Sequence, residues 1–179
     1  MTAVSCSPGR TKGLDGLRAG SGVLVSGLLV ALRDAAQARL AELLLEGSSP
    51  PFDLDGMIVY YAAPTAGRSG LAVGSAGPTT SSRMDCWLGM LLSLGASATM
   101  GKGPRSRSSV RLCVEHRAPY LAAIGGAGAY YASRVRSSRV LAWPDLGPEA
   151  VHAMEVDSFP AFVGIDAAGE TMFSAGGMA

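Results

Sequence analysis

The stretch VLVSGLLVALRDAAQARLAELLLEG, residues 23–47, places a run of β-branched and apolar residues directly before a helical pattern. Residues 23–29 predict a β-strand, because they are mostly β-branched or apolar. After Arg33-Asp34 the apolar residues follow the spacing of an amphipathic α-helix: Ala36, Leu40, Leu43 and Leu44. Gly47 is suited to end that helix, so this stretch predicts a strand followed by a helix.

The same alternation of short apolar runs with helical patterns continues along the chain and favours an α/β fold. The further strands that we expect span residues 57–62, 71–76, 98–100, 120–124, 139–143, 151–156 and 161–165. Helical patterns cover residues 84–92, 106–117 and 127–135, and Gly95 closes the first of them. We expect the last two strands, separated by Asp157-Ser158-Phe159-Pro160, to be antiparallel additions to the sheet.

The composition predicts one domain with a core of its own, because the chain has 179 residues and 48% of them are hydrophobic. Residues 1–16 are rich in Gly, Ser, Thr and charge, so we expect a flexible leader there and the domain at 17–179. The net charge of +1 provides no global attraction to nucleic acid or to an anionic membrane. The longest apolar stretch, residues 22–32, is well short of the roughly 20 residues of a membrane-spanning helix.

The three cysteines, Cys6, Cys86 and Cys113, are too few and too scattered for a disulfide framework. No pair has the short spacing of a metal-binding knuckle, so the sequence assigns no metal ligand to this chain. The first twenty residues also lack the apolar core of a signal peptide. Reduced thiols and the absence of an export signal together favour a cytoplasmic location.

The run Gly77-Pro78-Thr79-Thr80-Ser81-Ser82-Arg83 lies just before the helical pattern at 84–92. Any of its hydroxyl residues is suited to cap the helix, so the positive end of the helix would open toward Gly77-Pro78. A basic residue such as Arg83 is mildly disfavoured in the first turn of a helix unless an anion lies there too. The run therefore suggests a carboxylate site, with an ordinary capped helix and a solvated arginine as the alternative.

Two further basic residues stand at the ends of predicted strands. Lys102 lies between Gly101 and Gly103 after a short apolar run, and Lys12 is the only other lysine in a chain whose remaining basic residues are arginines. A lysine here suggests a need for a compact point charge, although a solvated loop lysine is the alternative. Arg33 lies where a strand gives way to a helix, a common place for ligand contacts in α/β folds; the alternative is a surface ion pair with Asp34.

The chain contains a series of motifs in this order: Arg33-Asp34-Ala35-Ala36, Pro51-Phe52-Asp53-Leu54, Tyr60-Tyr61, the run from Gly74 to Thr80, Arg83-Met84-Asp85, Gly101-Lys102-Gly103, the run from Ala122 to Ala127 and the run from Glu155 to Ala161. The series resembles the β-type half of class I fumarases and tartrate dehydratases. The resemblance covers about residues 17–173 and implies a single swivelling β/β/α three-layer domain with a mixed sheet. Gln37 departs from the pattern, since the family commonly has histidine there.

The resemblance also implies a function. In that family an α-type part ligates a [4Fe–4S] cluster, so this chain would act only with a partner α subunit that holds the cluster. Arg33, Thr79, Arg83 and Lys102 would bind a small dicarboxylate, and Thr79 and Lys102 would be catalytic. Thr79 matches the proposed base of the family, although it could instead only bind substrate or cap the helix.

The resemblance leaves the substrate open. The implied reaction is the reversible dehydration of (S)-malate to fumarate. Dehydration of L(+)-tartrate to oxaloacetate and a non-catalytic dicarboxylate-binding assembly subunit are the alternatives.

Two unrelated functions fit the sequence less well. Gly125-Gly126-Ala127-Gly128 suggests a nucleotide-binding loop, but Tyr131 stands where the dinucleotide motif needs glycine or alanine. Basic residues that could suggest nucleic-acid binding match exposed helix faces and are balanced by acidic residues elsewhere: Arg105, Arg107, Arg111, Arg117, Arg134, Arg136 and Arg139. We therefore expect neither a nucleotide cofactor nor a nucleic-acid partner.

Overall fold

The computed structural model describes residues 1–68 and 70–173. Within them the strands form one mixed sheet in the order β2-β1-β3-β4-β5-β6-β8-β7. The strands are β1 (Thr2–Ser7), β2 (Arg10–Lys12), β3 (Gly22–Ala31), β4 (Ile58–Tyr60), β5 (Ala98–Gly101), β6 (Tyr120–Ala122), β7 (Val135–Ala142) and β8 (Val151–Ile165). The helices are α1 (Asp34–Leu45), the 3-10 helix η1 (Ser81–Trp87), α2 (Leu88–Ser93), α3 (Arg107–Glu115), α4 (Gly128–Ala132) and the 3-10 helix η2 (Pro144–Glu149).

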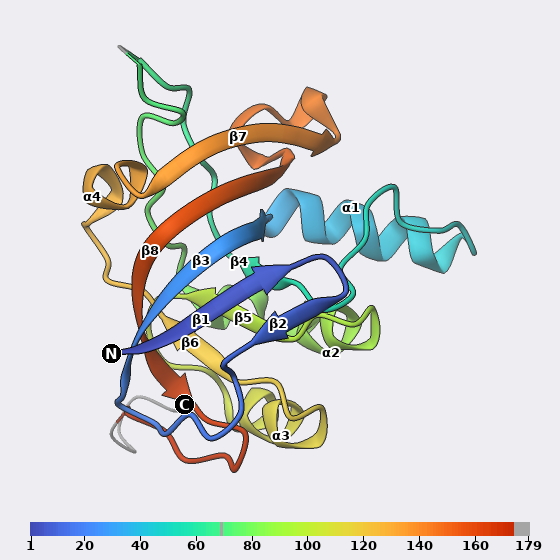
Figure 1. The fold of residues 1–179 in the computed structure, drawn as a ribbon. Helices are drawn as coiled ribbons and strands as arrows, with labels where there is room; N and C mark the ends of the chain where they lie inside the picture. Colours follow the sequence, from blue (N-terminus) through green and yellow to red (C-terminus); the bar gives the residue numbers. More distant parts are fainter. Residues whose placement is uncertain (69, 174–179) are drawn as a thin grey trace.

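The sheet closes on itself. β3, β4, β5 and β6 pair in parallel, and β8 pairs antiparallel with both β6 and β3, which completes a five-stranded barrel. β1 and β2 extend the sheet beside β3, and β7 pairs antiparallel with β8. In Figure 1, β1, β3 and β8 lie in front of β4, β5 and β6, while α1, α2 and α3 lie along one side. The α/β class with a mixed sheet is therefore confirmed. The closure of the sheet into a barrel was not predicted from the sequence.

The last strand differs from the prediction of two strands at 151–156 and 161–165, which is wrong. β8 runs without interruption for 15 residues and keeps pairing with β3 through Phe159 and Pro160. Ser158 has a φ of 51°, and its N–H donates to the side chain of Ser26 where the register shifts. A β-bulge therefore accommodates a sequence that resembles a turn, and the long strand can reach both β3 and β6. The expected antiparallel pairing is confirmed.

Residues 1–16 do not behave as the expected flexible leader, because Thr2–Ser7 pairs in parallel with β3 and Arg10–Lys12 folds back on it. Val4 and Cys6 are buried on one face of β1. These two positions alternate with exposed residues, as in a strand that covers a core on one side. Such a short alternation in a polar segment is a weak sequence signal for a strand. Pairing with β3 stabilises the strand, although its own composition does not favour one.

Helix boundaries also differ locally. The predicted helix at 84–92 starts as the 3-10 helix η1, and only Leu88–Ser93 is α-helical. Residues 71–76 form no named strand, whereas the strand expected at 139–143 starts earlier, at Val135. The helices expected at 106–117 and 127–135 are present as the shorter α3 and α4. Among the described residues, no helix has the length and apolar character needed to cross a membrane.

Candidate functional site

A pocket of about 310 Å³ lies at the carboxyl ends of the parallel strands β3, β4 and β5. Its lining consists of Arg33, Ala63, Ser75, Gly77, Pro78, Thr79, Thr80, Arg83 and Lys102. All four site residues predicted from the sequence therefore share one pocket. A larger hollow of about 470 Å³ is lined by residues 50–54 and Leu94, without a basic side chain. The smaller pocket is the better candidate site, because it alone of the two gathers basic side chains at a strand-end position where α/β folds bind ligands.

The backbone fixes Thr79 between two strand ends. The Thr79 N–H donates to the Tyr61 carbonyl at 2.6 Å, and the Lys102 N–H donates to the Thr79 carbonyl at 3.0 Å. The Ser81 N–H then donates to the Lys102 carbonyl at 2.9 Å, so Thr80 forms an isolated parallel β-bridge with Lys102 beside the end of β5. Thr79 and Lys102 are held as neighbours by main-chain hydrogen bonds, independently of their side chains.

The close approach of these segments requires glycine at position 101. A Cβ atom on Gly101 would lie 2.2 Å from Ser81 Oγ and 3.1 Å from the Thr79 carbonyl oxygen. Gly125 has a similar role toward the lysine side chain, because its Cβ would lie 3.2 Å from Lys102 Cδ. The glycines that flank the predicted site therefore make space for its other members.

The expected helix-capping role of the hydroxyl run is wrong. Thr80 is the residue before η1, but its side chain makes no capping hydrogen bond. The α-helical part, α2, has six residues and begins five positions after Arg83. Because 3-10 geometry replaces the first turns, a helix dipole contributes little to this pocket, and its attraction for anions comes from side chains.

Two arginines of the pocket share one carboxylate. Arg33 Nε donates to Asp34 Oδ2 at 2.8 Å, and Arg83 Nη2 donates to Asp34 Oδ1 at 2.6 Å. Burial alone would raise the pKa of Asp34, but the hydrogen bond from Arg33 and the charges of both arginines outweigh burial and lower that pKa. Asp34 is therefore an anion at neutral pH. Arg33 Nη2 also lies 3.5 Å from Glu149 Oε1.

Lys102 is the third cation of the pocket. Its side chain runs past Gly125 and is partly exposed. Within residues 1–68 and 70–173, no carboxylate forms an ion pair with its ammonium group. The lysine charge is thus available to an anion that enters the pocket.

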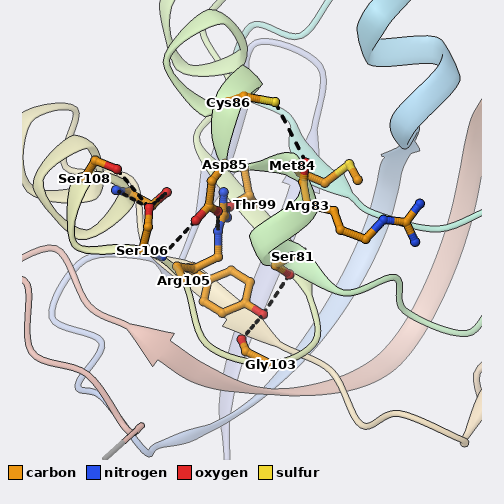
Figure 2. Close-up of polar contacts among 12 residues, drawn as sticks. Ser81, Arg83, Met84, Asp85, Cys86, Thr99, Gly103, Arg105, Ser106 and Ser108 are labelled. Carbon is orange, nitrogen blue, oxygen red and sulfur yellow. Dashed lines mark hydrogen bonds and ion pairs between the residues drawn. The ribbon is translucent and has the colours of Figure 1, made fainter. Parts of the chain in front are cut away.

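A buried ionic network lies behind the pocket, and no local sequence pattern predicted it. Arg105, expected to be on an exposed helix face, is instead buried and ion-paired with Asp85. Its Nη1 donates to Thr99 Oγ1 at 3.2 Å, while Asp85 Oδ2 accepts the Ser106 N–H at 2.8 Å. Figure 2 shows these contacts, with the Arg83 side chain directed away from them. The network joins η1, which carries Arg83, to β5 and the segment after Lys102.

Aromatic residues enclose the Arg105 guanidinium. It lies 5.4 Å from the Tyr61 ring centroid and 5.2 Å from that of Tyr120, within the range of cation–π contacts. The Tyr120 hydroxyl lies 2.9 Å from Ser81 Oγ and donates to the Gly103 carbonyl at 2.9 Å. One buried cluster therefore fixes both segments that line the pocket. The burial of Arg105 results from aromatic neighbours that are distant in sequence. The local sequence therefore does not indicate it.

Gln37, a departure from the family pattern, is buried on α1, where it faces η1. Its Nε2 lies 3.1 Å from Met84 Sδ, and its Oε1 has no partner among the described residues. Gln37 does not line the pocket.

The cysteines do not fit an iron–sulfur cluster within this chain. Cys6 is buried in β1, where it accepts hydrogen bonds from Thr11 and the Ile58 N–H, and Cys113 is buried in α3. Burial raises the pKa of the Cys113 thiol to about 11, which disfavours the thiolate that binds metal. Cys86 is exposed on η1. In the described part of the chain, no three His, Cys, Asp or Glu side chains gather as a metal site.

Comparison with known proteins identifies the relatives of this chain. It is 39% identical to fumarate hydratase 2 of Leishmania major over 87% of this chain and 28% of that protein. It is 38% identical to the anaerobic class I fumarate hydratase of Escherichia coli over 83% of this chain and 28% of that protein. The chain thus spans a little over a quarter of the length of the fumarate hydratases that it matches.

A relative of similar length also matches. A Methanocaldococcus jannaschii protein provisionally named L(+)-tartrate dehydratase subunit beta is 35% identical over 88% of this chain and 84% of its own length. A family model described as the fumarase C-terminus matches residues 7–176, nearly the whole chain. Together with the pocket at the strand ends, these matches show that the chain belongs to the fumarase C-terminus family.

Proposed function

We propose that this chain is the β subunit of a class I fumarase-like hydro-lyase that interconverts (S)-malate and fumarate. The observation that carries the proposal is the convergence of Arg33, Thr79, Arg83 and Lys102 on one pocket in a member of the fumarase C-terminus family. Three cations around a small polar pocket suit a dianion, because charge-assisted hydrogen bonds to carboxylates are among the strongest that proteins make.

Each pocket residue has a proposed role. Arg33 and Arg83 bind substrate carboxylates through the guanidinium donors that Asp34 leaves free. Lys102 adds a point charge beside Thr79, to which its main chain is hydrogen-bonded. Thr79 handles the C3 proton of malate. A hydroxyl is a poor base near neutral pH, so this role depends on the neighbouring Lys102 and Arg83 charges, which favour the alkoxide form.

A partner α subunit is part of the proposal. The cysteines of this chain do not fit a [4Fe–4S] cluster, and the whole fumarate hydratases that it matches are more than three times longer than the matched region. We therefore assign the cluster to an α subunit, together with the remainder of the active site. The match over 84% of a protein provisionally named a beta subunit supports a separate chain. Free thiols at all three cysteines support a cytoplasmic location.

Dehydration of L(+)-tartrate to oxaloacetate is the second candidate, and the relative from Methanocaldococcus jannaschii favours it. Both reactions use a hydroxy-dicarboxylate, so the cationic pocket suits either substrate. Ser75 and Thr80, which also line the pocket, are further lining residues with a hydroxyl group suited to hydrogen-bond an extra substrate hydroxyl.

The test is to coexpress this chain with its α-type partner, reconstitute the cluster without oxygen, and supply malate and tartrate separately. Fumarate is followed by its absorbance and oxaloacetate by a coupled reduction. We expect dehydration of one of the two substrates by the complex and none by this chain alone. A complex that binds dicarboxylates without turnover would instead indicate an assembly subunit and refute the enzymatic proposal.

A further inference from the structure

Asp34 connects two arginines that belong to different elements. Arg33 immediately precedes α1, whereas Arg83 lies on η1, and the two oxygens of Asp34 accept one hydrogen bond from each. The Arg83 side chain is 52% exposed and has no other ion-pair partner among the described residues. Among the described residues, Asp34 is also the only hydrogen-bond partner of this side chain, so it supplies the directional contact that orders several rotatable bonds.

Glu149 fixes the other side of this arrangement. Its Oε2 accepts the N–H of Ala35 at 3.0 Å, in the first turn of α1, and its Oε1 lies 3.5 Å from Arg33 Nη2. The backbone that carries Arg33 and Asp34 is therefore attached to η2 as well as to β3. Asp34 therefore attaches the exposed Arg83 side chain to this backbone.

The carboxylate also changes the electrostatics of the pocket. Arg33, Arg83 and Lys102 alone would create a strongly positive concavity that attracts any small anion. Asp34 neutralises part of this charge but occupies only one donor on each arginine, and each guanidinium has five. The remaining donors keep fixed directions, so binding depends more on the shape of the anion and less on its charge.

From this arrangement we infer that Asp34 is a positioning and selectivity residue of the carboxylate site. It orients the Arg33 and Arg83 guanidinium groups for an organic dicarboxylate and lowers the affinity of the pocket for simple inorganic anions. The inference rests on the proposed function, since it takes the pocket as the dicarboxylate site. Asp34 acts through the two arginines and does not itself contact the substrate.

The test compares Asp34→Asn with the wild type in the complex with the α-type partner. Succinate, a dicarboxylate without a hydroxyl group to eliminate, and inorganic sulfate are titrated separately by calorimetry. We expect succinate to bind at least about 10-fold more weakly to the variant, because charged hydrogen bonds to both arginines are lost. Sulfate should bind equally or more tightly. A variant that merely unfolds the pocket would lose both ligands in parallel.

Asp145→Asn is the matched control, because it also removes one carboxylate that pairs with an arginine of α1, Arg39, but outside the pocket. It should leave both affinities unchanged.

In turnover, Asp34→Asn should raise KM for the hydroxy-dicarboxylate by a larger factor than it lowers kcat. Modification by phenylglyoxal, followed peptide by peptide, should become several-fold faster at Arg83 in Asp34→Asn and stay at the wild-type rate in Asp145→Asn.

The outcomes separate this inference from the proposed function. Turnover by the wild-type complex with unchanged succinate affinity in Asp34→Asn, or a parallel loss of succinate and sulfate, would overturn the role of Asp34 alone. Opposite changes in the two affinities without any turnover would support Asp34 and refute the hydro-lyase proposal. No saturable binding of succinate and no turnover by the wild type would overturn both.

Discussion

The guanidinium group of Arg105, whose side chain has no exposed surface, is ion-paired with Asp85, two residues after Arg83 on η1. A buried charge without its partner is costly, because the interior cannot replace the hydration that the group has lost. Arg105 already has one donor, Nη2, without a partner among the described residues. The pair therefore stabilises the segment that carries Arg83 and makes it sensitive to mutation.

Asp85→Ala should destabilise the protein by about 3–5 kcal/mol, the range measured when one member of a buried ion pair is removed. Urea unfolding monitored by tryptophan fluorescence measures this change. Asp157→Ala removes the partner of Arg136, whose side chain is 64% exposed, and should leave the unfolding midpoint nearly unchanged. Equal effects of the two substitutions would show that burial of Arg105 is not what makes Asp85 important.

Arg83→Ala and Lys102→Ala should each lower kcat/KM by at least about 100-fold while the complex still assembles. Each change removes a charged donor from the pocket wall, and neither side chain is part of the core. Steady-state kinetics and gel filtration of the complex test this expectation. Arg107→Ala, on the exposed face of α3, serves as the control and should keep normal turnover. Near-normal turnover in either pocket variant would show that the site is misassigned.

Thr79→Val separates proton transfer from binding. Valine keeps the shape of threonine and replaces only the hydroxyl with a methyl group, and the two main-chain hydrogen bonds of Thr79 remain. If the hydroxyl handles the proton, kcat should fall by at least about 100-fold with little change in KM. Thr79→Ser, which restores a hydroxyl, should recover much of the loss. A change confined to KM would instead assign Thr79 to substrate binding.

Gly101→Ala should destabilise the chain and impair the site together, because the new methyl group would lie 2.2 Å from Ser81 Oγ. Gly89→Ala is the control, and we expect it to change the stability in the opposite direction. Gly89 lies in α2, and its Cβ would be 3.8 Å from the nearest heavy atom, in Leu112. Alanine there should stabilise the helix by about 0.5–1 kcal/mol. Thermal unfolding of both variants measures the contrast, and a tolerated Gly101→Ala would mean that the strand ends can separate without cost.

Local patterns predicted many individual elements, including β3, α1 and the short strand β5 before Lys102. They failed where a residue depends on distant partners. Asp157-Ser158-Phe159-Pro160 resembles a turn, yet pairing with β3 carries β8 through it. Arg105 resembles a surface arginine, yet Asp85, Tyr61 and Tyr120 together enclose it. The shared position of the four site residues could be predicted only from the family resemblance.

The sequence by itself determined the α/β alternation, because periodicity is a property of neighbouring residues. The family resemblance, carried by the order of the motifs, proposed the candidate residues Arg33, Thr79, Arg83 and Lys102. Only the tertiary structure decided that β3 and β8 close a barrel, that Thr2–Ser7 joins the sheet and that Asp34 links two arginines. These features depend on hydrogen bonds and charges between segments far apart in the chain. Local sequence does not specify such pairings, because they stabilise the protein only when the whole fold brings the two segments together.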